Sequence, residues 1–338
     1  MSEILKPLIV RLCEAETLSY DEMQTAFSIL MEGEASNAQI AAFMIALKLR
    51  TETASDIAAG ASQMRANTHK IDAPAGSIDI VGTGGDGAHS LNISTAAALI
   101  VAGCGVPVAK HGNRAVSSKS GAADVLSELG INLDCDFSLI EKSIRQAGIG
   151  FLMAPRHHPA LRHVGPTRVE LGVRTIFNLL GPLSNPAFVN KALIGVYDKK
   201  WGRPFAEALA ILGTEHAFIV HGDGGLDEVS LSGPTLVYAL DKGNISEFHI
   251  KPEDFGVSSA PLKSIKGGGA EYNASKLGEL LDGVQGAYRD IACINAATAL
   301  VATKNEESLS VAFNRAKQAI DTGAAKGALN QLIAITNS

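Results

Sequence analysis

A glycine-rich loop between an expected strand and an expected helix constrains this chain more than any other feature. The segment 77–95, SIDIVGTGGDGAHSLNIST, begins with an alternating apolar and polar run that is typical of a strand. Four glycines follow within residues 82–87. Because glycine loses more backbone entropy on folding than other residues, so many indicate positive φ angles or the close approach of a ligand. A plain tight turn is the alternative, but it needs only one glycine.

The residues after this loop predict the start of a helix. Asn92, Ser94 and Thr95 precede the apolar run 96–101. A strand, a glycine loop and a helix N-terminus together present backbone N–H groups and the positive end of a helix dipole. The segment therefore predicts a binding site for an anion.

Composition limits the class of protein. The 338 residues are 46% apolar and 19% charged, which is typical of a globular protein with one large domain and a smaller one. A net charge of −6 argues against a nucleic-acid partner. No leader and no apolar run of membrane-spanning length is evident, so we expect a cytoplasmic protein without a membrane contact. The four cysteines are widely spaced, which predicts buried free thiols in a reducing compartment.

Periodicity predicts two regions. Residues 1–70 form successive amphipathic helices, with capping-box spacing at Ser19/Glu22 and Ser36/Gln39. From residue 71 onward strand-like runs at 78–81, 106–110, 149–153, 192–197 and 217–221 alternate with helical patterns, and a hairpin joins 236–240 to 245–249. The expected fold class is α/β: a small N-terminal helical bundle domain plus a large α/β domain with a mostly parallel central sheet and flanking helices.

A second loop adds cations. The strand ending at Lys110 is followed by HGNRAVSSKSG, which contains His111, Arg114 and Lys119. Gly82, Gly84 and Gly87 also match the dinucleotide-binding spacing, but that fold needs an acidic residue where Lys110 stands. Two oxyanion loops at the ends of adjacent strands predict a ligand with two separated phosphates. A solvated basic turn is the alternative for the second loop.

A third loop supplies carboxylates. Asp227 and Glu228 follow the strand 217–221 among glycines, and Mg²⁺ binds phosphorylated substrates through a few such oxygen ligands. Ser94 is a candidate third ligand across the cleft. A solvated acidic turn is the alternative on spacing alone.

The region 164–186 reads as one helix bounded by glycine and proline, with Arg168 and Arg174 upon it. Arginine suits a bidentate carboxylate, although pairing with Glu170 or helix capping is an equal alternative. His157 and His158 are interpreted as loop structure. Without a nucleophile and base pair, no dedicated catalytic acid or base is predicted. The inventory suits a direct displacement in which phosphate or pyrophosphate leaves.

The runs GTGGDG, NIST, KHGNRAVSSKSG, RTIFNLLGPLSNP and GLDEVS, in this order, closely resemble those of the anthranilate phosphoribosyltransferases of tryptophan biosynthesis. The resemblance extends over nearly the whole chain. It implies transfer of the phosphoribosyl group of 5-phosphoribosyl 1-pyrophosphate (PRPP) to the amino group of anthranilate. Pyrimidine nucleoside phosphorylases share the architecture, and a phosphorylase or a non-catalytic paralogue with another ligand remains an alternative.

The resemblance also implies the site residues. Those expected to bind PRPP are Gly82, Gly85, Asp86, Ser90, Asn92, Ile93, Ser94, Thr95, Lys110, His111, Gly112, Asn113, Arg114, Ala115, Val116, Ser117, Ser118 and Ala122. Anthranilate is expected to contact Gly82, Asn113 and Arg168, and Mg²⁺ to be held by Ser94, Asp227 and Glu228. Ala122 stands where a serine is common in the family, which puts one phosphate hydroxyl in doubt.

The same resemblance implies the domain organisation and assembly. A helical domain at 1–70 is expected to be completed by a returning segment at about 168–185, and residues 71–165 and 186–338 to form the PRPP-binding α/β domain. A homodimer through the helical domain is expected.

Overall fold

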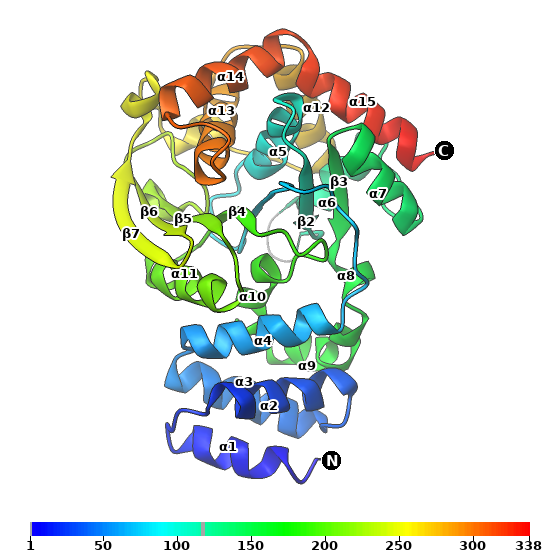
Figure 1. The fold of residues 1–338 in the computed structure, drawn as a ribbon, viewed down its shortest axis with the longest axis vertical. Coiled ribbons are helices and arrows are strands. Elements are labelled where there is room, and N and C mark those ends of the chain that lie inside the picture. Colours follow the sequence, from blue (N-terminus) through cyan, green and yellow to red (C-terminus); the bar gives the residue numbers. More distant parts are fainter. Residues whose placement is uncertain (1, 116–118) are drawn as a thin grey trace.

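Four helices form the N-terminal layer of the computed structural model, which describes residues 2–115 and 119–338 (Figure 1). They are α1 (Leu5–Cys13), α2 (Tyr20–Glu32), α3 (Asn37–Arg50) and α4 (Ala54–Ala66). The capping boxes at Ser19 and Ser36 are present as predicted, and Thr53 forms a third with Asp56. These side chains satisfy backbone N–H groups that would otherwise lack partners, so each helix begins at a defined residue.

A later segment of the chain returns to this layer. It comprises α9 (Gly165–Leu171), α10 (Phe177–Leu180) and η2 (Gly181–Leu183), and it is preceded by α8 (Ala154–His157) and η1 (Pro159–His163). Phe177 packs edge-on against Phe27, with ring centroids 5.8 Å apart. The prediction of a single helix over 164–186 is wrong: α9 ends where Gly172 adopts a φ of 62°, a left-handed C-cap, and Arg174 lies beyond it.

The central sheet has the strand order β1-β4-β5-β6-β7. Its strands are β1 (Asp79–Gly82), β4 (Lys191–Gly195), β5 (His216–Gly222), β6 (Thr235–Asp241) and β7 (Asn244–Ile250). The first three are parallel, while β6 and β7 form the predicted antiparallel hairpin. The parallel pair β2 (Val108–Gly112) and β3 (Ile149–Met153) joins β1 through a bridge between Ile78 and Val108.

The sheet is flanked by α5 (Ile93–Gly103), α6 (Ala122–Glu128), α7 (Phe137–Gln146) and α11 (Gly202–Ile211), and the C-terminal region is helical as expected. That region forms α12 (Ala270–Leu281), α13 (Ala287–Ala302), α14 (Leu309–Asp321) and α15 (Ala324–Thr336) around α5 (Figure 1). The short turns η3 (Lys199–Trp201), η4 (Asp223–Gly225), η5 (Pro252–Phe255) and η6 (Leu262–Ile265) complete the described elements. None of the described helices is both long enough and apolar enough to cross a bilayer.

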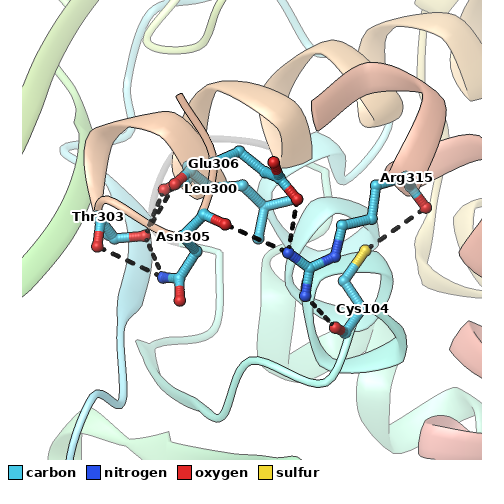
Figure 2. Close-up of polar contacts among 7 residues, drawn as sticks. Cys104, Leu300, Thr303, Asn305, Glu306 and Arg315 are labelled. Carbon is cyan, nitrogen blue, oxygen red and sulfur yellow. Dashed lines mark hydrogen bonds and ion pairs between the residues drawn. The ribbon is translucent and has the colours of Figure 1, made fainter. Parts of the chain in front are cut away.

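The C-terminal end of α5 is held by a side chain from α14 (Figure 2). Arg315 donates to the carbonyl oxygen of Cys104 at 2.5 Å and pairs with Glu306 at 2.8 Å. A cation at this end of a helix stabilises the helix dipole. Burial raises the pKa of the Cys104 thiol to about 11. Cys135 and Cys293 are buried free thiols as expected, whereas Cys13 is exposed.

Candidate active site

The glycine loop has the backbone that its sequence predicts. Gly84, Gly85 and Gly87 have φ values of 68°, 75° and 75°, which side-chain-bearing residues rarely adopt. Thr83 anchors the loop to the neighbouring chain: its N–H donates to Gly195 O at 2.9 Å, and its Oγ1 accepts from the Tyr197 N–H at 3.0 Å. The loop is thus a built structure at the carboxyl ends of β1 and β4, and the simple tight turn is excluded.

Two glycines leave the space in which Asp227 lies, and this pair is called the glycine seat below. Gly82 and Gly195 are register partners in the parallel strands β1 and β4. A Cβ on Gly82 would overlap the Asp227 carboxylate, and one on Gly195 would overlap the Asp227 backbone. The carboxylate oxygen Oδ2 then accepts from the Gly84 N–H at 2.7 Å. Sequence reasoning missed Gly195, although a glycine inside a strand often marks such a close approach.

Glu228, Ser94 and Lys110 meet beside Asp227. The Ser94 N–H, in the first turn of α5, donates to Glu228 Oε1 at 3.0 Å. Lys110 reaches from β2, and its Nζ donates to Ile80 O at 2.6 Å and to Ser94 Oγ at 3.3 Å. Lys110 is only 2% exposed, so its amine lies inside the site and not on a solvated surface.

Asp227 and Glu228 both have raised pKa values in this arrangement. Burial raises the pKa of Asp227 to about 7, and the charge of Asp86 contributes to the rise. Burial also raises the pKa of Glu228 well above its usual value, with the Asp227 charge adding to the effect. Burial lowers the pKa of Lys110, although Asp79, Glu228 and Asp227 oppose that shift.

This set of groups fits a divalent cation. Two carboxylates and a serine hydroxyl are oxygen ligands of the kind that Mg²⁺ prefers. A cation between the carboxylates would relieve the repulsion that raises their pKa values. Because Gly84 and Ser94 bind the carboxylates through backbone N–H groups, the alternative of a solvated acidic turn is excluded.

The second loop divides into a buried and an exposed part. His111 is 3% exposed, and its ring Nδ1 lies 3.1 Å from Gly181 O. Arg114 is exposed and pairs with Asp124 at 3.0 Å. Asn113 is also exposed, and its Oδ1 accepts from the Arg114 N–H at 2.8 Å. Ala115 donates to the same Asp124 at 2.9 Å. The predicted residues Val116, Ser117 and Ser118 lie outside the described residues.

Buried Asp79 supports the start of this loop. Its carboxylate accepts from the Asn185 amide at 2.7 Å and from the His111 N–H at 3.1 Å. Asn185 also donates to Ala109 O at 2.8 Å, so β1, β2 and the returning segment share one polar junction. Burial raises the pKa of Asp79 to about 6. This junction was not predicted, because its members are far apart in the sequence.

The other predicted donor residues lie at the start of α5 and α6. Asn92 is the N-cap of α5, Ile93 and Thr95 are 1% exposed in its first turn, and Ser90 precedes it in the loop. Thr95 Oγ1 is buried without a hydrogen-bond partner among the described residues. Gly112 ends β2 and faces Ala122, the first residue of α6.

A cavity of about 420 Å³ adjoins the second loop. It is lined by Asn113, Ala154, Pro155, His158, Pro159, Leu161 and Arg162. His158 is 3% exposed, and burial lowers its pKa to about 4, so its ring is neutral at pH 7. The interpretation of His157 and His158 as loop structure is wrong for His157, which ends α8, and correct for His158, which lies between α8 and η1. No spacing signal indicated that His158 would line the cavity.

The two arginines of the returning segment take different positions. Arg168 lies on α9 with its guanidinium 5.3 Å from the Phe177 ring centroid, and burial lowers its pKa. Arg174 stacks on Tyr197 at 4.0 Å and donates to the Gly85 carbonyl. Neither pairs with Glu170 among the described residues. Arg174 therefore connects the returning segment directly to the glycine loop.

Comparison with known proteins decides the family. A sequence model described as the helical bundle domain of a glycosyl transferase family matches residues 6–68, and one described as the a/b domain of that family matches residues 75–326. The chain is 53% identical to the anthranilate phosphoribosyltransferase of Agrobacterium fabrum over 333 residues, 98% of this chain and 97% of that protein. The chain belongs to the anthranilate phosphoribosyltransferase family.

Solved structures of anthranilate phosphoribosyltransferases have the same fold. The crystal structure of the Thermus thermophilus protein superposes with a TM-score of 0.92 at 39% identity, covering 98% of this chain and 99% of that one. The Saccharomyces cerevisiae protein in complex with PRPP and Mg gives a TM-score of 0.91 at 30% identity, covering 99% of each chain. The fold class predicted from the sequence is confirmed.

The glycine seat gives a first prediction. Gly195→Ala should displace the Asp227 backbone by about 1 Å or more and lower the free energy of unfolding by about 1–3 kcal/mol, because the new methyl group has no space. A crystal structure and denaturant unfolding would measure both effects. The control is Gly278→Ala on α12, where a Cβ meets nothing and should be neutral or slightly stabilising. An Asp227 backbone that does not move in Gly195→Ala would contradict the seat.

Proposed function

We propose that this chain transfers the phosphoribosyl group of PRPP to the amino group of anthranilate. The products are N-(5-phosphoribosyl)anthranilate and pyrophosphate, and the step belongs to tryptophan biosynthesis. The observation that supports this most strongly is the meeting of the glycine loop, Lys110 and the Asp227–Glu228 pair at one end of the parallel strands. They meet in a chain that matches anthranilate phosphoribosyltransferases over nearly its full length.

We assign the donor to the glycine loop and its neighbours. The pyrophosphate would lie on Gly82 to Asp86, and the 5-phosphate would meet Asn92, Ser94, Thr95 and the loop that begins at Lys110. Three observations support this: the positive φ angles of the loop, the buried Lys110 amine, and the Thr95 hydroxyl, which has no hydrogen-bond partner within residues 2–115 and 119–338. Backbone N–H groups and a helix N-terminus are suited to phosphoryl oxygens.

We assign Mg²⁺ to Ser94, Asp227 and Glu228. A related yeast protein contains Mg together with PRPP. When bound, the cation supplies positive charge that stabilises the developing pyrophosphate. Within this chain, the Gly84 and Ser94 N–H groups orient the two carboxylates that would hold it.

The reaction is a displacement at C1 of the ribose. The anthranilate nitrogen forms a bond to C1, the bond from C1 to the pyrophosphate oxygen breaks, and its electron pair leaves with pyrophosphate. The nitrogen then releases a proton to solvent, and the configuration at C1 is inverted. The oxocarbenium-like transition state needs positioning and neutralisation of the leaving group. The loop N–H groups supply these for the pyrophosphate, and no dedicated acid or base is assigned.

We assign anthranilate to contacts with Gly82, Asn113 and Arg168, of which Asn113 also lines the cavity beside the second loop. Asn113 lines the cavity, whose size suits a small aromatic molecule. Neutral His158 adds a wall that does not repel an aromatic amine. The Arg168 guanidinium has no acidic partner among the described residues and is free to meet a carboxylate.

The decisive experiment mixes the protein with PRPP, Mg²⁺ and anthranilate and follows the loss of anthranilate fluorescence. The expected result is a loss that requires all three components. The matched control, Asp227→Asn with Glu228→Gln, should retain the fold by circular dichroism and lose turnover by at least about 100-fold, since the cation ligands are gone. No signal from the unmodified protein at high concentration would overturn the proposal.

The acceptor assignment predicts a selective effect. Arg168→Ala should raise the KM for anthranilate by about 10- to 100-fold, as expected for the loss of a charged hydrogen bond, and change the KM for PRPP by less than about threefold. Steady-state kinetics with each substrate varied would measure this. Arg203→Ala, a surface arginine paired with Glu207, is the control and should change neither KM. An equal rise in both values would show that Arg168 does not bind the carboxylate.

We propose two domains, with residues 1–70 and about 168–185 forming the helical domain, and residues 71–165 and 186–338 the α/β domain. Residues of α2 to α4 share a buried cluster with Ile176, Phe177 and Leu180 of the returning segment. The Arg65 side chain also donates to Leu183 O at 2.8 Å. The Arg65 contact supports the assignment of the returning segment to the helical domain. The buried cluster also includes residues of β4, β5 and α11, so it joins the two domains.

We propose a cytoplasmic location. All four cysteines are free thiols, a state that a reducing compartment preserves. Burial raises the pKa of Cys293 to about 12, which keeps this thiol protonated and unreactive.

We also propose a homodimer through the helical domain. This domain exposes Ile4 and Val10 beside α1, Leu49 near the end of α3 and Val169 on α9, with exposures of 62%, 55%, 80% and 82%. Covering such apolar side chains with a second copy would remove them from water. Val10→Asp with Leu49→Asp should shift the mass measured by light scattering from twice 35.2 kDa toward 35.2 kDa. Val311→Asp on α14 is the control, and a dimer that survives the double change would contradict this interface.

A further inference from the structure

Asn92 occupies the N-cap of α5 without capping it. Asparagine is favoured at this position because its carbonyl oxygen accepts a hydrogen bond from an N–H of the first turn. The Asn92 side chain makes no such bond. The Ser94 N–H, one of the natural partners, donates instead to Glu228 at 3.0 Å. The Asn92 carboxamide is therefore available for another task.

That carboxamide is held by a second asparagine. Asn273, on α12 and 1% exposed, donates through Nδ2 to Asn92 Oδ1 at 2.9 Å. Asn273 Oδ1 in turn accepts from the Gly268 N–H at 2.8 Å. These two hydrogen bonds link the Gly268 backbone amide to the Asn92 side chain through Asn273.

These two hydrogen bonds can run in only one direction. A backbone N–H can only donate, so the atom of Asn273 that faces Gly268 must be its oxygen. The Asn273 amide nitrogen then faces Asn92, and the atom of Asn92 that receives it must also be an oxygen. The two N–H donors of Asn92 Nδ2 are left on the opposite side, where they donate to none of the described residues.

The backbone next to these hydrogen bonds is also held in place. The Tyr288 hydroxyl donates to the Asn92 carbonyl oxygen at 3.1 Å. Gly267 N–H donates to His89 O at 2.8 Å, and Leu91 N–H donates to Ile265 O at 2.9 Å. The segment 265–268 thus supports the whole turn that precedes α5. Asn273 and Gly268 also border a small hollow with Ser90 and Lys119.

We infer that Asn273 is a positioning residue that fixes the Asn92 carboxamide with its N–H donors toward the phosphoryl oxygens of PRPP. The inference rests on the proposed function, because it deepens the role of Asn92 in the donor site. Without Asn273, Asn92 can rotate and present its oxygen to the anion, which repels it. Asn273 does not touch the substrate and acts only through Asn92.

The test is binding of PRPP with Mg²⁺, measured by isothermal titration calorimetry on the full chain. Asn273→Asp keeps the acceptor for Gly268 but has no N–H for Asn92, so Asn92 must turn its own amide inward. The Kd for PRPP should rise about 10- to 100-fold, as for the loss of a charged hydrogen bond. The melting temperature and the KM for anthranilate should change little, whereas a merely structural role would lower the melting temperature instead.

A second set of variants, made with Asn92→Ala, distinguishes loss of the Asn273–Asn92 hydrogen bond from simple charge repulsion. In an Asn92→Ala background, Asn273→Asp should raise the Kd by less than about threefold, because no carboxamide remains to be turned. The repulsion of an added carboxylate would persist in that background. An equal factor in both backgrounds, or no change of Kd in the Asn92 protein, would overturn the inference.

Asn273→Leu removes both hydrogen bonds without adding charge and covers the case in which the aspartate variant does not fold. Asn92 can then adopt either orientation, so the Kd should rise about two- to fivefold, in proportion to the competent fraction. A Kd equal to that of the unmodified protein would contradict the positioning role of Asn273. Failure of the proposed function is distinct, since the unmodified protein would then neither bind PRPP nor consume anthranilate.

Discussion

The position of Asp227 over the Gly82–Gly195 pair is the constraint on which the site depends. Two strands that end side by side with glycines leave space for the Asp227 segment to cross their carboxyl ends. That crossing brings Asp227 to the Gly84 N–H and Glu228 to the Ser94 N–H. The glycine loop and the acidic loop, 143 residues apart, become one site because no Cβ stands between them.

The helix α5 transmits this arrangement into the body of the protein. Its N-terminus meets Glu228 and Lys110, and its C-terminus is held by Arg315 through Cys104 O. Asn273 and Tyr288 fix the residue that precedes its first turn. Helices α12, α13 and α14 therefore help to fix both ends of α5, which gives the C-terminal region a role beyond packing.

Much of the fold follows from local sequence. Capping boxes at Ser19 and Ser36 define helix starts because their hydrogen bonds join residues three apart. The hairpin of β6 and β7 is equally local. The region 164–186 shows the limit of that reasoning, since the apolar pattern continued through Gly172 while the backbone there turned left-handed. Arg174 consequently faces the glycine loop, a contact that no spacing rule predicts.

The chemical character of the site follows from local sequence: glycines where the backbone needs positive φ, a basic loop that predicts a phosphate site, and paired carboxylates suited to Mg²⁺. The packing of distant segments sets which of these groups meet and which atoms they present. Lys110 is buried and donates to Ser94, His158 lines a cavity, and Gly195 is one of the two glycines that leave space for Asp227. The reason is physical: steric space and hydrogen-bond polarity depend on neighbours far away in the chain, and a sequence pattern reports only those nearby.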